Sequence, residues 1–194
     1  LAVALILAGV SVTAAQIAPP MRNYGGDRLE SRMLDTGERV TEFIGNAYFE
    51  DQDLRADGDL GRYYSESRLL EIVGDVLVRS DSLDMWTDSL RVFRDEGKGF
   101  AYGSVRIETE DGAIGIGDRA RYDRQAEWLT LLDEARVIDG ANVIEGDSIL
   151  IRQAEGTMEA WGSVKVVDEV NRSVVEGRHG FFDRETGLAV VDSL

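Results

Sequence analysis

A short motif repeats along this chain with a nearly constant period, and it constrains the fold more than any other feature. The motif is a glycine followed by apolar residues at the second and fourth positions after it. Its five copies begin at Gly45, Gly74, Gly103, Asp133 and Gly162, at spacings of 29, 29, 30 and 29 residues. A period of this length indicates a repeat architecture, in which each unit buries its apolar face by stacking on its neighbours.

Apolar and polar residues alternate on both sides of each motif glycine. In the second copy, Leu70 and Ile72 precede the glycine. Val76 and Val78 follow it at the same parity. Alternation with a period of two is typical of a strand with one apolar face, so each copy predicts a strand of about ten residues. A glycine on the inward face at mid-strand indicates a bend or a bulge, and we therefore expect a V-shaped cross-section.

A second motif lies between the copies of the first. It is a small residue and an aspartate followed by two inward positions, at Gly58-Asp59, Thr87-Asp88, Gly117-Asp118 and Gly146-Asp147, with a fifth copy at Gly177-Arg178 that lacks the aspartate. Turn sequences such as Asp95-Glu96-Gly97 separate the two motifs. Each period therefore predicts two strands joined by a turn, in an all-β fold that stacks along one axis around a shared interior.

The chain divides into three segments by composition. Residues 1–15 carry no charge and run through an apolar stretch to small residues, which predicts an export signal peptide cleaved before Gln16, or a retained membrane anchor. Residues 16–38 are expected to be an N-terminal linker that can include a first strand. Residues 39–194 are expected to be the repeat domain. Leu188 and Val190 begin a further strand, so we expect the domain to be truncated at its C-terminal end.

Composition excludes several functions. The chain has 37 acidic and 21 basic residues, a formal net charge of -16, and such an excess disfavours nucleic acid and anionic lipid surfaces as partners. The chain contains no cysteine, which excludes disulfides, thiol nucleophiles and thiolate metal sites. We therefore look for a function that depends on the apolar interior.

Candidate catalytic groups are few. His179 is the one histidine and lies in the degenerate copy of the second motif. The aspartates of the second motif recur at one corner of each period, which favours a structural cap over paired catalytic carboxylates. The runs Asp51-Gln52-Asp53 and Asp57-Gly58-Asp59 leave open a loose divalent-ion contact. We expect no enzyme activity, no cofactor and no dedicated metal site.

The two alternating motifs resemble the OstA/LptA-type β-jellyroll family of lipopolysaccharide transport. The resemblance covers roughly residues 40–191 and is clearest at Gly45-Asn46-Ala47-Tyr48-Phe49, Gly146-Asp147-Ser148-Ile149-Leu150-Ile151 and Met158-Glu159-Ala160-Trp161-Gly162-Ser163-Val164. It implies an elongated, V-shaped β-jellyroll of two stacked antiparallel sheets in the periplasm, whose interior holds lipid A acyl chains. It also implies partners: lipopolysaccharide or a similar lipid, and components of the outer-membrane translocon or the inner-membrane transporter.

The predicted function is a lipid-binding scaffold that carries lipopolysaccharide across the periplasm to the outer membrane. The interior residues expected to contact lipid are Phe49, Val76, Val78, Val92, Val105, Ile107, Tyr122, Val137, Ile149, Ile151, Val164 and Val166. Small inward residues such as Ala101 and Ala160 favour an interior that does not close completely. The alternatives are a structural β-solenoid or surface adhesin with a dry core and, least favoured, a β-helix polysaccharide lyase.

An open strand array leaves unpaired backbone groups at its two edges. The first edge is expected near residues 39–49 and the last near residues 162–191. Neither segment contains a proline, so both can accept another strand. We therefore expect head-to-tail association with like β-jellyroll domains by edge pairing.

Overall fold

The computed structural model describes residues 23–51 and 54–192, and their regular secondary structure is entirely β. The predicted all-β fold is confirmed. The thirteen strands are β1 (Asn23–Gly25), β2 (Arg28–Met33), β3 (Arg39–Asp51), β4 (Leu54–Tyr64), β5 (Leu69–Ser80), β6 (Leu83–Phe93), β7 (Lys98–Thr109), β8 (Ile114–Asp123), β9 (Trp128–Asp139), β10 (Asn142–Arg152), β11 (Thr157–Asp168), β12 (Ser173–Asp183) and β13 (Leu188–Asp192). No helix in these residues is long and apolar enough to cross a membrane. The expected signal segment, residues 1–15, lies outside the described residues.

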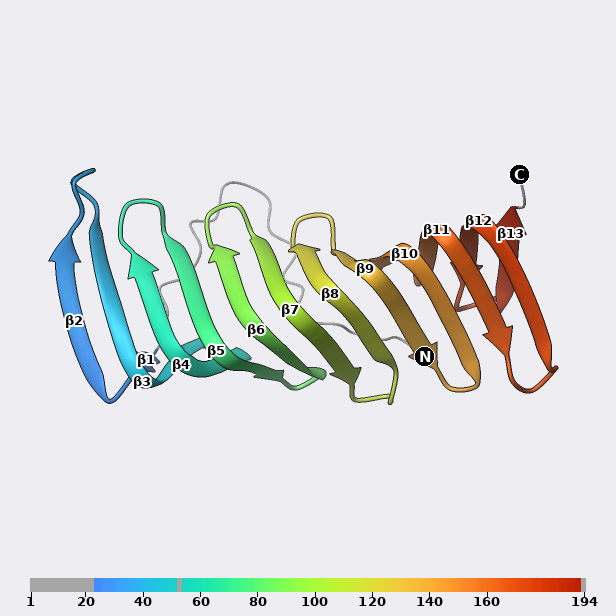
Figure 1. Ribbon diagram of the computed structural model, residues 1–194, viewed down its shortest axis with the longest axis horizontal. Coiled ribbons are helices and arrows are strands. Elements are labelled where there is room, and N and C mark those ends of the chain that lie inside the picture. Colours follow the sequence, from blue (N-terminus) through green and yellow to red (C-terminus); the bar gives the residue numbers. More distant parts are fainter. Residues whose placement is uncertain (1–22, 52–53, 193–194) are drawn as a thin grey trace.

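The strands form one antiparallel sheet in which sequence neighbours pair from β3 to β13, while β1 and β2 both pair with β3. Figure 1 shows the strands side by side in chain order along the long axis of the molecule. The two stacked sheets expected from the sequence are the two halves of this single bent sheet. We call them the first arm, which contains residues 69–73 of β5, and the second arm, which contains residues 76–80.

A β-bulge at the middle of the long strands creates the bend. Between β5 and β6, the residue pairs Val73 with Ser89 and Val76 with Thr87 flank the bend. β5 has two residues between these pairs and β6 has one. An extra residue in one strand kinks the ladder and increases its twist, as in other bulges. The repeated glycine is the first bulge residue, and Gly74 has a φ of 86°.

The repeated aspartates pack against these glycines from the neighbouring strand. A Cβ added at Gly74, Gly103 or Gly162 would collide with the carboxylate of Asp59, Asp88 or Asp147, respectively. Asp27, outside the predicted repeat, makes the same contact with Gly45, where an added Cβ would lie 2.7 Å from Oδ2. Glycine is required at the bend for two reasons, because the backbone is left-handed there and because a carboxylate occupies the space.

The fourth bend is built without glycine. Asp133 occupies the glycine position with a φ of 60°, and Glu134 follows with a φ of 52°. Arg119 Nε donates a hydrogen bond to Asp133 Oδ2 at 2.5 Å. This hydrogen bond lowers the pKa of the Asp133 carboxyl. The bend therefore forms here with an ion pair in place of the aspartate-glycine contact.

The two ends of the sheet differ in how their edges are covered. β2 pairs with residues 39–44 of β3, and β1 pairs with residues 48–50. The first edge expected near residues 39–49 is therefore wrong, because two preceding strands without the repeat motif cover it. At the other end, β13 pairs only with residues 179–183 of β12. Within the described residues, Ser173–Gly177 of β12 are paired on the β11 side alone.

Candidate lipid-binding groove

The inward residues of both arms form one hydrophobic cluster, and most of its least exposed members lie next to the bend. We call the residues nearest the bend the apex row: Ala47, Ile72, Val76, Val105, Leu131, Ala135, Ile149, Ala160 and Val164 are at most 2% exposed. We call the partly buried residues nearer the strand ends the mouth row: Tyr63, Met85, Val92, Tyr122, Ile151 and Val166. The arms therefore pack tightly at the apex and diverge toward the mouth.

Contacts between the arms show how close they approach at the apex. The rings of Phe43 in the first arm and Phe49 in the second arm lie edge to face, with centroids 5.2 Å apart. A Cβ added at Gly58 would lie 2.5 Å from Ile72 Cγ2. A Cβ added at Gly61 would lie 2.5 Å from Phe49 Cε2. Small residues at the apex thus allow aromatic and branched side chains of the opposite arm to fill the interior.

All twelve residues expected to contact lipid lie on this inner face. Eight are buried in the core cluster: Phe49, Val76, Val78, Val105, Ile107, Val137, Ile149 and Val164. The other four, Val92, Tyr122, Ile151 and Val166, belong to the mouth row. The structure brings the twelve together on one continuous face but at two depths.

A cavity of about 380 Å³ opens between the arms over the second half of the sheet. Its apolar wall includes Ile107, Leu129, Val137, Ile151 and Met158, and its polar rim includes Thr109, Asp139, Gln153 and Arg184. A volume of this size is within the range of small-molecule and lipid pockets. The cavity gives the apolar interior an accessible part.

Sequence reasoning missed the rim of the cavity and part of the inner face. Gln153 and Arg184 lie in turns outside both motifs, although turn residues also recur with the period of the repeat. Met85 and Ile144 face inward on the second arm, before the bends of β6 and β10. The bulge shifts the alternation of those strands by one residue at the bend, so their two halves have different parity in the sequence.

Ion pairs join the two arms across the mouth. Arg184 in the turn after β12 contacts Asp139 Oδ2 at the end of β9, with an Nη2–Oδ2 distance of 2.6 Å. The same Nη2 lies 3.7 Å from Asp111 Oδ2. Arg94 in the turn after β6 lies 3.6 Å from Asp51 at the end of β3. These pairs bridge opposite arms, because the turns of the first arm carry the arginines and the ends of the second arm carry the aspartates.

Tyr122 is one of two tyrosines in the mouth row, with Tyr63. Burial raises the pKa of its phenol to about 12. The phenol therefore stays neutral at physiological pH and adds no charge to the apolar wall. Tyr122 is an amphipathic residue suited to a boundary between apolar interior and water.

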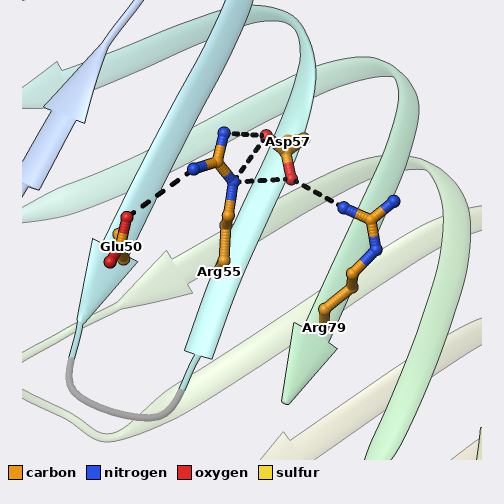
Figure 2. Close-up of polar contacts among 4 residues, drawn as sticks. All are labelled: Glu50, Arg55, Asp57 and Arg79. Carbon is orange, nitrogen blue, oxygen red and sulfur yellow. Dashed lines mark hydrogen bonds and ion pairs between the residues drawn. The ribbon is translucent and has the colours of Figure 1, made fainter.

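The outer face of the sheet is charged, in contrast to the interior. Figure 2 shows Arg55 between Glu50 and Asp57, with Arg79 contacting Asp57 from the next strand. Asp57 Oδ1 accepts hydrogen bonds from Arg55 Nη2 at 2.7 Å and from Arg55 Nε at 2.9 Å. The Arg55 guanidinium also lies 4.7 Å from the ring centroid of Tyr48. Around Arg55 this face is charged and solvated, whereas Val73, Tyr102, Trp128 and Trp161 are exposed elsewhere on it.

The acidic side chains do not gather into a metal site. Among the residues that the structure describes, no group of three or more histidine or carboxylate side chains is placed to hold an ion. Asp57, in the second of the two aspartate runs, forms ion pairs with Arg55 and Arg79. Gln52 and Asp53 of the first run lie outside the described residues.

Comparison with known proteins defines the family. A family model described as LptA/(LptD N-terminal domain) LPS transport protein matches residues 59–157. The chain belongs to this family. The matched segment runs from β4 to the start of β11 and contains most of the cavity lining, with Met158, Arg184 and Glu185 beyond it.

Curated relatives are longer proteins of the same family. The LPS-assembly protein LptD of Pseudomonas putida is 23% identical over 147 residues, which are 76% of this chain and 15% of that protein. LptD of Pseudomonas fluorescens is 26% identical over 98 residues, which are 50% of this chain and 10% of that protein. This chain thus spans a small part of the length of the relatives it matches.

A solved structure with a similar chain is that of LptH, the LptA homologous periplasmic component of the lipopolysaccharide transport device of Pseudomonas aeruginosa. The two chains are 20% identical, with a TM-score of 0.48, and the match covers 66% of this chain and 83% of LptH.

Proposed function

We propose that this chain is a lipid-carrying domain of lipopolysaccharide transport and that the acyl chains of lipopolysaccharide lie between its two arms. The observation that carries the proposal is the cavity, which opens an otherwise packed apolar interior between the arms. Family membership supports lipopolysaccharide as the cargo. The inner face is favoured as the binding surface because its apolar side chains form one continuous cluster, whereas exposed apolar residues of the outer face, such as Trp128 and Trp161, lie outside that cluster.

Carriage of this kind needs no covalent step. Transfer of a hydrocarbon chain from water into an apolar groove contributes about 0.8 kcal/mol for each methylene buried. An open mouth lets the sugar and phosphate groups remain in water while the chains are covered. A non-enzymatic role agrees with the matched relatives, which are described as transport and assembly proteins.

The proposal extends to location and partners. Transport between the two membranes places the domain in the periplasm, either as a soluble protein after signal cleavage or held by a retained anchor. Its partners are then the inner-membrane transporter, the outer-membrane translocon and like β-jellyroll domains.

A dry structural solenoid is the competing function, and the complete burial of the apex row favours it. The two functions predict different results for adjacent residues on opposite faces. Ile151 lines the cavity, whereas Leu150, the preceding residue of β10, faces outward. Ile151→Asp adds a charge to the groove, and Leu150→Asp adds the same charge outside it.

The test is co-purification of lipopolysaccharide with the chain expressed in a lipopolysaccharide-producing host, measured by mass spectrometry per mole of folded protein. We expect bound lipopolysaccharide with the unmodified chain and with Leu150→Asp, and at least a tenfold loss with Ile151→Asp. Equal, background amounts in all three proteins would favour the dry solenoid.

A further inference from the structure

The turns at the mouth carry a repeated pair of positions, one from each arm. On the first arm these positions are the residues that follow β6, β8, β10 and β12: Arg94, Arg124, Gln153 and Arg184. On the second arm they are the last residues of β3, β5, β7 and β9: Asp51, Ser80, Thr109 and Asp139. The first and last pairs form the ion pairs across the mouth. The two middle pairs cannot, because Ser80 and Thr109 carry no charge.

The cavity coincides with this gap in the row of ion pairs. Thr109 and Gln153 both line the cavity, and so do the paired residues Asp139 and Arg184. The Thr109–Gln153 pair thus forms no ion pair where the apolar interior is accessible, and Arg184 supplies the bridge beside it, to Asp139 and, at 3.7 Å, to Asp111 in the turn after β7. A ligand chain that enters here passes beside Arg184.

Gln153 has an unused hydrogen-bond donor at this opening. Its backbone N–H donates to the Glu127 carbonyl at 3.1 Å, and its carbonyl accepts from the Gly156 N–H at 3.2 Å. Its side-chain Nε2 is buried and has no acceptor among the described residues. A buried amide donor without an acceptor is destabilising, and such groups in native proteins commonly await a ligand or an ordered water.

The neighbouring hydroxyl does not supply the missing acceptor. Thr109 Oγ1 accepts a hydrogen bond from the Ala113 N–H at 2.9 Å and also contacts the Asp111 carboxylate. The Arg184 guanidinium is already paired with Asp139 and Asp111. No acceptor among the described residues lies within hydrogen-bond distance of Gln153 Nε2, so an acceptor brought by a ligand would satisfy it.

The charges around the cavity restrict what that acceptor can be. Asp139, Glu155 and Glu185 line the same cavity as Arg152 and Arg184. Arg184 is paired with Asp139 and Arg152 with Glu159, so the carboxylates of Glu155 and Glu185 disfavour an anionic group beside Gln153. A neutral carbonyl oxygen is the remaining common acceptor in a lipid. It also has the required position, because an acyl carbonyl is bonded directly to the hydrocarbon chain that the apolar wall would hold.

We propose that Gln153 binds the carbonyl oxygen of an acyl ester or amide linkage, with the attached hydrocarbon chain in the cavity beside Ile107, Leu129 and Met158. The inference rests on the proposed lipid-carrying function and adds the part of the lipid that is recognised. The three rotatable bonds of the glutamine side chain allow Nε2 to turn from its buried position toward the cavity that the residue lines. The headgroup beyond the carbonyl stays outside the mouth.

The test compares two lipids that differ only at the linkage. The probes are a lysophosphatidylcholine with an ester-linked chain and its ether-linked analogue of the same chain length, which lacks the carbonyl. Binding to the full chain is measured by isothermal titration calorimetry below the critical micelle concentration. We expect the ester lipid to bind about two- to tenfold more tightly, as the net contribution of one hydrogen bond predicts.

Gln153→Leu and Gln153→Met remove the donor and keep the volume of the side chain. Both variants should bind the two lipids equally, and removal of the unpaired donor should leave the melting temperature of the empty protein unchanged or raised. Gln125→Leu is the matched control, since Gln125 is an exposed glutamine in the preceding turn. It should keep the preference for the ester.

Two other outcomes are distinguishable. Binding of both lipids by the unmodified chain without a preference, or a preference that survives in Gln153→Leu and Gln153→Met, would overturn the role of Gln153 and leave lipid carriage standing. Binding of neither lipid would contradict lipid carriage itself and the inference with it.

Discussion

The apex and the mouth of the groove are built from the same alternating pattern of residues, but their side chains differ in how completely they are buried. At the apex, Val105, Leu131 and Ile149 are fully buried, and the interior resembles any packed β core. At the mouth, Tyr122 and Ile151 are partly exposed. The difference follows from the V shape, because the separation of the arms increases with distance from the bend. One apolar face can therefore supply both stability and a binding surface.

The largest expected effect is on stability at the apex. Ile149→Ala should lower the free energy of unfolding by about 2–5 kcal/mol, because it leaves a cavity between packed arms. Ile151→Ala, two residues along the same strand, should cost about 1 kcal/mol or less, because its site already borders open space. Urea denaturation of both variants measures the difference. Equal losses would show that depth in the groove does not separate core from binding surface.

The second effect compares glycines at the bend and at the mouth. Gly103 at the bend and Gly140 in a mouth turn both have positive φ values, of 81° and 59°. A Cβ at Gly140 meets nothing within 4 Å, whereas a Cβ at Gly103 meets Asp88. Gly140→Ala should therefore cost only the backbone strain, about 1 kcal/mol. Gly103→Ala should cost about 2–3 kcal/mol, and a thermal melt that ranks the two variants oppositely would contradict the bend geometry.

A third effect concerns the ion pair across the mouth. Arg184→Gln removes the contacts with Asp139 and Asp111, which are partly exposed, so stability should fall by only about 0–1 kcal/mol. Loss of the bridge should nevertheless speed lipid exchange, measured as transfer of a fluorescent acyl lipid to vesicles. Arg178→Gln, on an exposed residue of β12, is the control. Unchanged exchange in Arg184→Gln would mean that this pair does not restrain the mouth.

The smallest effect is the acid response of one mouth turn. Hydrogen bonds from the backbone N–H and hydroxyl of Ser67, and from the Glu66 N–H, lower the pKa of the Glu38 carboxyl below its ordinary value of 4.5. A carboxyl with a lowered pKa in the folded state stabilises the fold above its unfolded pKa and loses that contribution as the pH falls through its folded pKa. Stability of Glu38→Gln should therefore fall less steeply below pH 4.5 than that of the unmodified chain. Parallel pH profiles would show that this turn contributes nothing.

Much of the inner face could be predicted, because side-chain direction in a strand is fixed by a period of two. That rule places Val76 and Val105 inside without any knowledge of contacts. It fails for Met85, where a bulge shifts the parity, and it says nothing of how deep a residue lies. The depth depends on the angle between the arms, which is a property of the assembled sheet.

The edges and the rim could not be predicted for a different reason. β1 and β2 cover β3 although they lack the repeat motif, so only backbone pairing and the Asp27–Gly45 contact identify them. Arg184 and Asp139 are 45 residues apart in the sequence. Turn residues are polar in any repeat, and nothing local distinguishes a solvated arginine from one that crosses the mouth.

Site-specific photocrosslinking to lipopolysaccharide in cells tests the central claim most directly. A photoreactive residue is placed in turn at Ile151 in the mouth row, at Ile149 in the apex row and at Arg106 on the outer face. The account predicts a strong lipopolysaccharide adduct from Ile151, little from Ile149, and none from Arg106. Adducts from Arg106 equal to those from Ile151 would contradict carriage of the lipid between the arms.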